Sequence, residues 1–183
     1  MPVQIGGKAE SDFNTPLGLL SDCHRRIENF LALLIRVAHG ARGRVLSAED
    51  RAALEKALDY FRDSAPQHTA DEEESLFPRL RGLDHPLANS ALASIDALEA
   101  DHVAAAADHA VVDSLGRRWL EHGALSADEH GLLNGALDRL SAVYVRHIAV
   151  EDAEVFPLAG KILQANDLAS MGDEMARRRG LRR

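Results

Sequence analysis

Cysteine is almost absent from this chain. Its 183 residues include one cysteine, Cys23, which excludes an internal disulfide framework and a metal site built from several thiolates. A lone free cysteine is most often a buried structural thiol, and we expect Cys23 to be one. Any metal chemistry must therefore use nitrogen and oxygen ligands.

Aromatic residues and long apolar runs are also scarce. Aromatic side chains make up 4% of the residues, and β-branched runs are few beside abundant Ala and Leu, which favours helix over sheet. The chain holds no apolar run of eighteen residues and no charged-then-apolar leader, so we expect a soluble, cytoplasmic protein that does not enter a membrane. Its length and its hydrophobic content of 46% suit one compact domain.

Basic charge is in short supply as well. The chain has 21 Lys and Arg against 29 Asp and Glu, and its formal net charge is −8. Such an acidic chain is not expected to bind nucleic acid. We expect the basic tail to complement the C-terminus of its own helix. This tail holds Arg177, Arg178, Arg179, Arg182 and Arg183.

Capping and breaking residues divide the chain into four long helices and a short fifth one. Residues 1–14 show no periodicity and form an expected flexible N-terminal arm, and residues 15–183 form the expected metal-binding domain. Thr15, Ser47 and Ser126 are N-cap residues, whereas Pro66 predicts a kink and Pro157 a helix end. The expected helices cover residues 16–40, 48–76, 86–123, 127–155 and 166–179. Short connections then predict an all-α fold, an antiparallel up-down-up-down four-helix bundle with a short fifth C-terminal helix.

A metal-ligand pattern occurs twice in the chain. His68-Thr-Ala-Asp-Glu72 is matched 79 residues later by His147-Ile-Ala-Val-Glu151, and each is followed closely by Phe-Pro. The same offset relates further residues of the two halves, which indicates a duplicated helical hairpin. Four residues along an α-helix lead back to the same face one turn on, so the His and Glu of each pair can reach one centre.

Two more histidines complete the pattern. His24 and His102 lie 78 residues apart, so the repeat makes them equivalents on the two remaining long helices. Four His and two Glu are too many for one tetrahedral zinc, and buried carboxylates need a positive partner. We therefore expect two metal ions that share carboxylates. Nitrogen and oxygen ligands favour iron, with manganese or zinc as alternatives, and occupancy by a single ion stays open. The expected ligands are His24, His68, Glu72, His102, His147 and Glu151.

The order of these motifs, a single His, His-x3-Glu, a single His and again His-x3-Glu, resembles that of the haemerythrin family, in particular the bacterial HHE cation-binding domains. The resemblance covers residues 16–179. It implies a non-haem di-iron centre in a four-helix bundle, with Glu72 and Glu151 as bridging carboxylates, and chemistry with dioxygen, peroxide or nitric oxide. Oxygen-carrying members differ by a second His on the third helix, where this chain has Ala106, and by a wider His-x4-Asp step. These differences argue against reversible oxygen carriage.

Three further residues are candidates for additional ligands or for partners of the ligands. Glu28 lies one turn after His24, and we expect it on the same inward face, the alternative being an edge residue that pairs with Arg25. Glu99 and Tyr144 each lie three residues before a ligand histidine. Their alternatives are a solvated edge for Glu99 and core packing for Tyr144. We also expect Asp71 and its acidic neighbours, apart from Glu72, to be solvated.

Two kinds of function stay open. The first is a di-iron protein that binds or reacts with a small diatomic ligand or peroxide, with enzymatic turnover undecided. The second is a non-catalytic module that holds iron, or senses metal or oxygen, and acts through a partner protein. A monomer or a homodimer is expected in either case.

Overall fold

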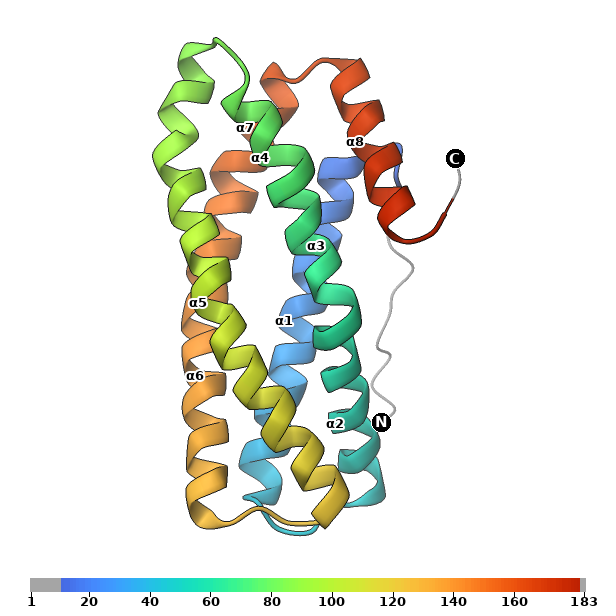
Figure 1. Cartoon of the computed structure of the whole chain (residues 1–183), viewed down its shortest axis with the longest axis vertical. Coiled ribbons are helices and arrows are strands. Elements are labelled where there is room, and N and C mark those ends of the chain that lie inside the picture. Colours follow the sequence, from blue (N-terminus) through green and yellow to red (C-terminus); the bar gives the residue numbers. More distant parts are fainter. Residues whose placement is uncertain (1–10, 182–183) are drawn as a thin grey trace. The chain divides into compact units, whose positions relative to one another are not determined.

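The structure, a computed structural model, describes residues 11–181. Every regular element among these residues is a helix, which confirms the expected all-α fold (Figure 1). Residues 1–10 of the expected arm, and Arg182 and Arg183 of the basic tail, lie outside the described residues.

Eight α-helices and three short π-helical turns, labelled η, follow one another along the described residues. Their order is α1 (Pro16–Ala41), α2 (Ala48–Asp59), η1 (Tyr60–Ser64), α3 (Ala65–Asp71), η2 (Glu72–Leu76), α4 (Phe77–Arg81), α5 (Pro86–His122), α6 (Ala127–Val150), η3 (Glu151–Val155), α7 (Phe156–Ile162) and α8 (Ala165–Arg178). Elements α2 to α4 continue one another without a break, as do α6 to α7, so these eleven elements form four long helices and the short α8.

The expected N-caps of the second and fourth long helices are confirmed. At the start of α2, Ser47 Oγ accepts a hydrogen bond from the backbone N–H of Asp50 at 3.0 Å. At the start of α6, Ser126 Oγ accepts from the N–H of Glu129 at 3.2 Å, and Glu129 Oε2 accepts from the N–H of Ser126 at 2.8 Å. This reciprocal capping box satisfies two N–H groups that the first helical turn leaves without partners.

Each π-turn ends two residues before a proline. The turns η1, η2 and η3 precede Pro66, Pro78 and Pro157. Proline cannot donate an N–H, and its ring clashes with the carbonyl four residues earlier. A widened turn relieves this clash, so the helix continues past the proline. The expected helix end at Pro157 is therefore wrong, because α7 continues to Ile162, and the expected end at residue 76 is wrong because α4 continues to Arg81.

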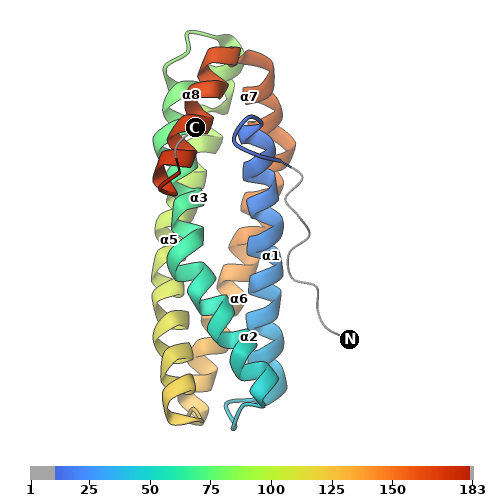
Figure 2. The same ribbon diagram turned by 90° about the vertical axis from the view of Figure 1, so that its right-hand side faces the viewer.

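The chain divides into two compact units. The first contains Met1–Arg26, Pro66–Ala100 and His147–Arg183, and the second contains Ile27–Ala65 and Asp101–Arg146. In each unit, segments of α1, of the α2–α4 run, of α5 and of the α6–α7 run lie side by side, and successive segments run in opposite directions (Figures 1 and 2). This is the expected up-down-up-down order.

The first unit has a core contributed by all of its helical segments. The fifth helix, α8, adds Met171 and Met175 to this core. Each fully buried side chain of this size contributes roughly 1.5–3 kcal/mol. The N–H of Ser11 donates to Asp22 Oδ2 at 2.9 Å, and Phe13 packs against the same core. Residues 11–14 of the expected arm are thus attached to the first unit. Other buried members of this core include Leu20, Leu76, Phe77, Leu80, Ile95, Leu98 and Phe156.

In the second unit, helices α2 and α5 pack closely against each other. A Cβ atom placed on Gly116 would lie 2.7 Å from Cδ1 of the buried Leu58, so any larger residue at this position would require the Leu58 side chain to move. One turn from Gly116, the buried indole of Trp119 donates its Nε1–H to the backbone carbonyl of Arg44 at 2.8 Å. The second unit therefore has a core of its own.

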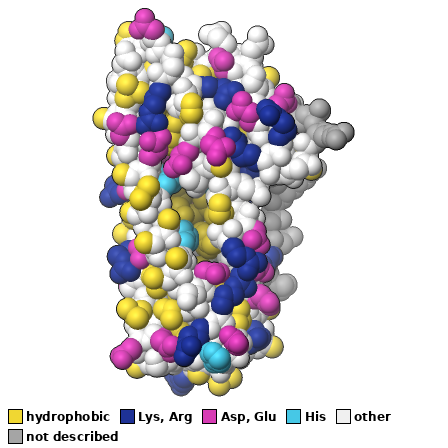
Figure 3. All heavy atoms as spheres, in the orientation of Figure 1, with side chains coloured by type: hydrophobic (Ala, Val, Ile, Leu, Met, Phe, Trp, Pro, Cys, Tyr) yellow, Lys and Arg dark blue, Asp and Glu magenta, His cyan; other side chains and the backbone are white. Residues whose placement is uncertain are grey.

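Two features of the described residues concern surface charge and helix hydropathy. On the face drawn in Figure 3, acidic and basic side chains of the described residues are interspersed. Among the helices that the structure describes, none combines the length and the hydropathy needed to cross a bilayer.

Candidate metal centre

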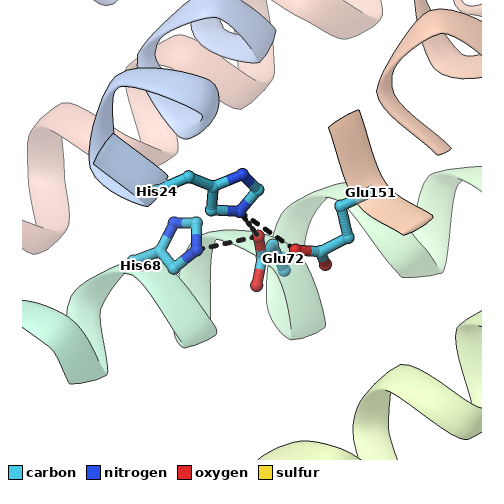
Figure 4. A group of neighbouring side chains, drawn as sticks. All are labelled: His24, His68, Glu72 and Glu151. Atoms are coloured by element: carbon cyan, nitrogen blue, oxygen red, sulfur yellow. Dashed lines mark ion pairs between the residues drawn. The ribbon is translucent and has the colours of Figure 1, made fainter. Parts of the chain in front are cut away.

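Four ionisable side chains meet inside the first unit (Figure 4). His24 comes from α1 and His68 from α3, while Glu72 and Glu151 are the first residues of η2 and η3. None of the four is more than 4% exposed. Each offers one ligand atom, and these atoms all lie within 4.8 Å of one another.

The distances between these atoms suit the surroundings of one metal ion. Nε2 of His24 lies 3.0 Å from Glu151 Oε2 and 3.7 Å from Glu72 Oε1, and Nε2 of His68 lies 3.1 Å from Glu72 Oε1. Nitrogen and oxygen donors bind such ions at about 2.0–2.2 Å, which puts neighbouring donors roughly 3.0–3.5 Å apart. The four side chains could therefore hold one ion with little movement.

In the second His-x3-Glu motif, as in the first, the histidine contacts the glutamate one helical turn later. Nε2 of the buried His147 lies 3.2 Å from Glu151 Oε2, one helical turn away. The sixth expected ligand, His102, belongs to α5 and is half-buried. It continues the helical face that bears the buried Ile95 and Leu98. Its role as a ligand stays a prediction.

Asp152 holds the ring of His24 in position. Asp152 Oδ1 lies 3.1 Å from His24 Nδ1 and accepts a second hydrogen bond from Ser21 Oγ at 2.8 Å. When Nδ1 carries the proton in this contact, Nε2 presents its lone pair to the centre, as in many carboxylate–histidine–metal arrangements. The ring of Phe156 also stacks on that of His24, with the ring centroids 5.2 Å apart. The Phe-Pro motif that follows Glu151 thus contributes a wall of the site.

The surroundings of the site shift the pKa values of its two histidines in opposite directions. Burial opposes the charged form of His24, but the nearby carboxylates of Asp152, Glu151 and Glu72 outweigh it and raise the pKa of His24 to about 11. Burial dominates at His68 and lowers its pKa, with a smaller opposing effect from Glu72. A proton on His24 thus supplies part of the positive charge that the buried carboxylates require, and a metal ion can supply it instead.

The donor set fits a metal ion. Both carboxylate oxygens of Glu151 and Nε2 of His24 are shielded from solvent. The 3.0 Å contact between the two side chains is an ion pair that lacks hydrogen-bond geometry. Buried carboxylate oxygens without hydrogen bonds are costly, and a cation is the partner that removes this cost. Imidazole nitrogens and carboxylates are ligands for iron, manganese and zinc.

Comparison with known proteins agrees with this geometry. The model of the "Hemerythrin HHE cation binding domain" family matches residues 15–159. The chain belongs to this haemerythrin family. A Haemophilus influenzae relative, which carries the name "Uncharacterized protein", is 29% identical over 180 residues, covering 91% of each chain. The family and the haemerythrin-like helical bundle expected from the sequence are thus confirmed, and the buried His and Glu cluster is the candidate metal-binding site of this domain.

Glu28, expected to lie beside the site, does not point inward. Glu28 is exposed, although His24 one turn earlier is buried. His24 lies towards the edge of the buried stripe of α1, and four residues rotate the chain by about 40° beyond a full turn, here away from that stripe. The expectation of an inward carboxylate at Glu28 is therefore wrong. Arg25, its alternative partner, forms its ion pair with Asp22.

The other two candidates form contacts of their own. Glu99 is half-buried and forms a two-pronged ion pair with Arg81, with Oε2 3.0 Å from Arg81 Nη2. This is the geometry of the edge alternative. Tyr144 is also half-buried, and its hydroxyl lies 2.8 Å from Nε2 of His109. His109 is thus the hydrogen-bond partner of Tyr144.

Sequence reasoning missed the function of Asp71. Its carboxylate is completely buried rather than solvated. Arg178 Nη1 donates to Asp71 Oδ1 at 2.8 Å, and Arg179 Nη2 donates to Oδ2 at 2.7 Å. Two arginines of the basic tail therefore bind the residue that precedes Glu72, and the expectation that they serve only their own helix end is wrong. The signal was weak because 107 residues separate Asp71 from Arg178.

Proposed function

We propose that this haemerythrin domain holds two iron ions and that the centre binds or reduces a small oxidant such as dioxygen, peroxide or nitric oxide. The observation that supports it is the buried cluster of His24, His68, Glu72 and Glu151, whose ligand atoms all lie within 4.8 Å of one another. The second ion would share Glu72 and Glu151 and use His147 together with His102, as the sequence repeat predicts. Manganese or zinc, and a single ion, are the competing occupancies.

The residues of the site would have different roles, some holding the ions and others orienting the ligands. Glu72 and Glu151 would hold the ions together with the histidines of the cluster. Asp152 would orient His24, while burial of the cluster would keep bulk water from reacting groups. When bound, iron supplies the electrons and the open coordination positions that reaction with a small oxidant needs.

Metal analysis and spectroscopy of one preparation test this proposal. Protein produced with iron should contain about two iron ions per chain, and its reduced form should change its absorption spectrum when dioxygen, peroxide or nitric oxide is added. Glu72→Ala should lose metal, because it removes a carboxylate central to the cluster. Glu55→Ala is the matched control, since Glu55 lies exposed on α2. Full metal content in Glu72→Ala would overturn the assignment of the site.

The same measurement separates the proposal from its alternative. A module that only holds iron or senses it would bind metal without consuming peroxide or nitric oxide beyond one equivalent per centre. Repeated consumption with an external reductant would establish turnover.

A further inference from the structure

The second unit contains a hydrogen-bonded pair of side chains that the metal centre does not use. The hydroxyl of Tyr144 on α6 lies 2.8 Å from Nε2 of His109 on α5. This distance lies within the range over which a base accepts a proton directly. The ring of His109 packs on Phe61 with centroids 4.8 Å apart, and its Nδ1 is shielded from solvent. The pair is thus held by packing on one side and by the hydrogen bond on the other.

His109 is an uncharged base at neutral pH. Burial lowers the pKa of its imidazole to about 4, although the carboxylate of Asp108 opposes this effect. Asp108 itself pairs with Arg139 at 2.6 Å. His109 also lines a pocket of about 190 Å³, together with the charged Arg62 and Asp113. An uncharged imidazole can accept a proton from Tyr144, which a protonated one could not do.

Tyr144 lies on the same helix as the candidate ligand His147. It lies three residues before His147, so both residues belong to the same side of the continuous helix α6. The chain has two tyrosines, and aromatic rings connect them within the second unit. From His109 the contacts pass to Phe61 and on to Tyr60, whose ring centroid lies 5.4 Å from that of Phe61.

We propose that Tyr144 is a redox-active residue that gives one electron to the oxidised metal centre while its phenolic proton passes to Nε2 of His109. The O–H bond of Tyr144 breaks and an N–H bond forms on His109. The products are a neutral tyrosyl radical, an imidazolium and a metal centre reduced by one electron. This inference rests on the proposed function for its oxidant, the iron centre after it has reacted with peroxide.

The geometry favours a coupled transfer of electron and proton. Loss of an electron alone would leave a phenol radical cation in a half-buried site, which costs desolvation energy. An oxidised phenol is a strong acid, so even the weakened imidazole of His109 takes its proton. Asp108 then lies where its charge stabilises the new imidazolium. Electron donation by Tyr144 would give the site one reducing equivalent beyond those of its metal ions.

The pair can be tested without iron chemistry. The full chain loaded with redox-inert zinc is oxidised by flash-generated ruthenium(III) tris-bipyridine, and radicals are recorded by electron paramagnetic resonance. We expect a tyrosyl radical that is lost in Tyr144→Phe and kept in Tyr60→Phe, the matched control. His109→Gln should slow its formation by about a hundredfold, in line with the loss of a positioned base. Wild-type formation should also be slower in D2O.

Three results would overturn the proposal. They are a radical that survives Tyr144→Phe at full yield, a rate that does not change in His109→Gln, or a rate that is equal in H2O and D2O. The isotope comparison uses the unaltered chain, so it decides the question even where a variant fails to fold.

A second arm adds peroxide to the iron-loaded protein. We expect the Tyr144 radical there too, and peroxide consumption without this radical would overturn donation to the metal. Absence of any peroxide reaction would instead refute the proposed function, and the zinc experiment would still decide whether Tyr144 and His109 act as a pair.

Discussion

At the scale of single residues, the site depends on side chains outside the His and Glu cluster that hold its members in position. Asp152 is an example, because it contacts His24 Nδ1 and leaves Nε2 to face the carboxylates of Glu72 and Glu151. The pKa of Asp152 is lowered even though burial raises it, since the hydrogen bonds from His24 and Ser21 favour the ionised carboxylate. An ionised Asp152 fixes both the orientation and the basicity of the ligand that it holds.

Asp152→Asn should therefore weaken metal binding without removing a ligand. We expect the affinity to fall by about 10–100-fold, the usual effect of losing such a partner. Competition with a chromophoric chelator measures it. Ser21→Ala, which removes one hydrogen bond to the same carboxylate, should have a smaller effect. Equal affinities in Asp152→Asn and the parent would show that His24 does not need this contact.

His109 predicts a pH dependence of stability. Its pKa is about 4 in the folded chain, against an ordinary value of 6.5, because burial disfavours the charged form. Between these values the unfolded chain binds a proton that the folded chain does not, so stability falls as pH falls from about 6.5 to about 4. We expect a loss on the order of 2 kcal/mol, below the full linkage value because the ring is partly exposed.

Urea unfolding at pH 7 and pH 4.5 measures this loss. His109→Gln removes the titrating group and should lose less stability over the same interval than the parent. His122→Gln, which changes an exposed histidine, is the control and should behave like the parent. An equal loss in the parent and in His109→Gln would mean that other groups cause the acid sensitivity.

At the scale of the elements, the prolines shape the site through the π-turns. In η2 and η3 the carbonyl that accepts the wide-turn hydrogen bond belongs to the glutamate of the centre itself, Glu72 or Glu151. Each glutamate thus lies six residues before the proline that causes the turn. The glutamate is the first residue of the π-turn in both halves of the chain. This repeated position indicates that the turn sets the direction of the carboxylate. π-Turns of this kind are frequent at functional sites.

Replacement of Pro157 tests this relation. In Pro157→Ala the clash disappears and the missing N–H returns, so we expect η3 to relax into an α-helix and the residues before it to turn out of register. Helix content should stay the same or rise by circular dichroism, while bound metal decreases. Pro86→Ala is the control, because Pro86 begins α5, where a proline costs nothing. Unchanged metal content in Pro157→Ala would show that the turn is held by packing instead.

At the scale of the whole chain, local signals and distant pairs differ in how far the sequence reveals them. Caps such as Ser47 and the His68–Glu72 step act within four residues, so their pattern predicts helix starts and candidate ligands directly. The contact of His24 with Asp152 spans 128 residues, and no local pattern marks it. The π-turns fall between these cases, because the prolines are visible in the sequence but whether a helix ends or widens depends on the packing around it.

The C-terminal helix offers the last prediction. Truncation after Glu174 removes Arg178 and Arg179 and leaves the buried carboxylate of Asp71 without these two ion pairs. An uncompensated buried charge costs about 3–5 kcal/mol, and the same cut removes Met175 from the core of the first unit.

We therefore expect the truncated protein to unfold at a lower temperature and to release metal more readily, because Asp71 adjoins Glu72. Truncation after Gly180 is the control, since it keeps both arginines. Calorimetry and metal analysis of the two truncated proteins decide the matter. If both behaved like the full chain, Asp71 would not depend on the arginines, and α8 would be dispensable for the metal centre.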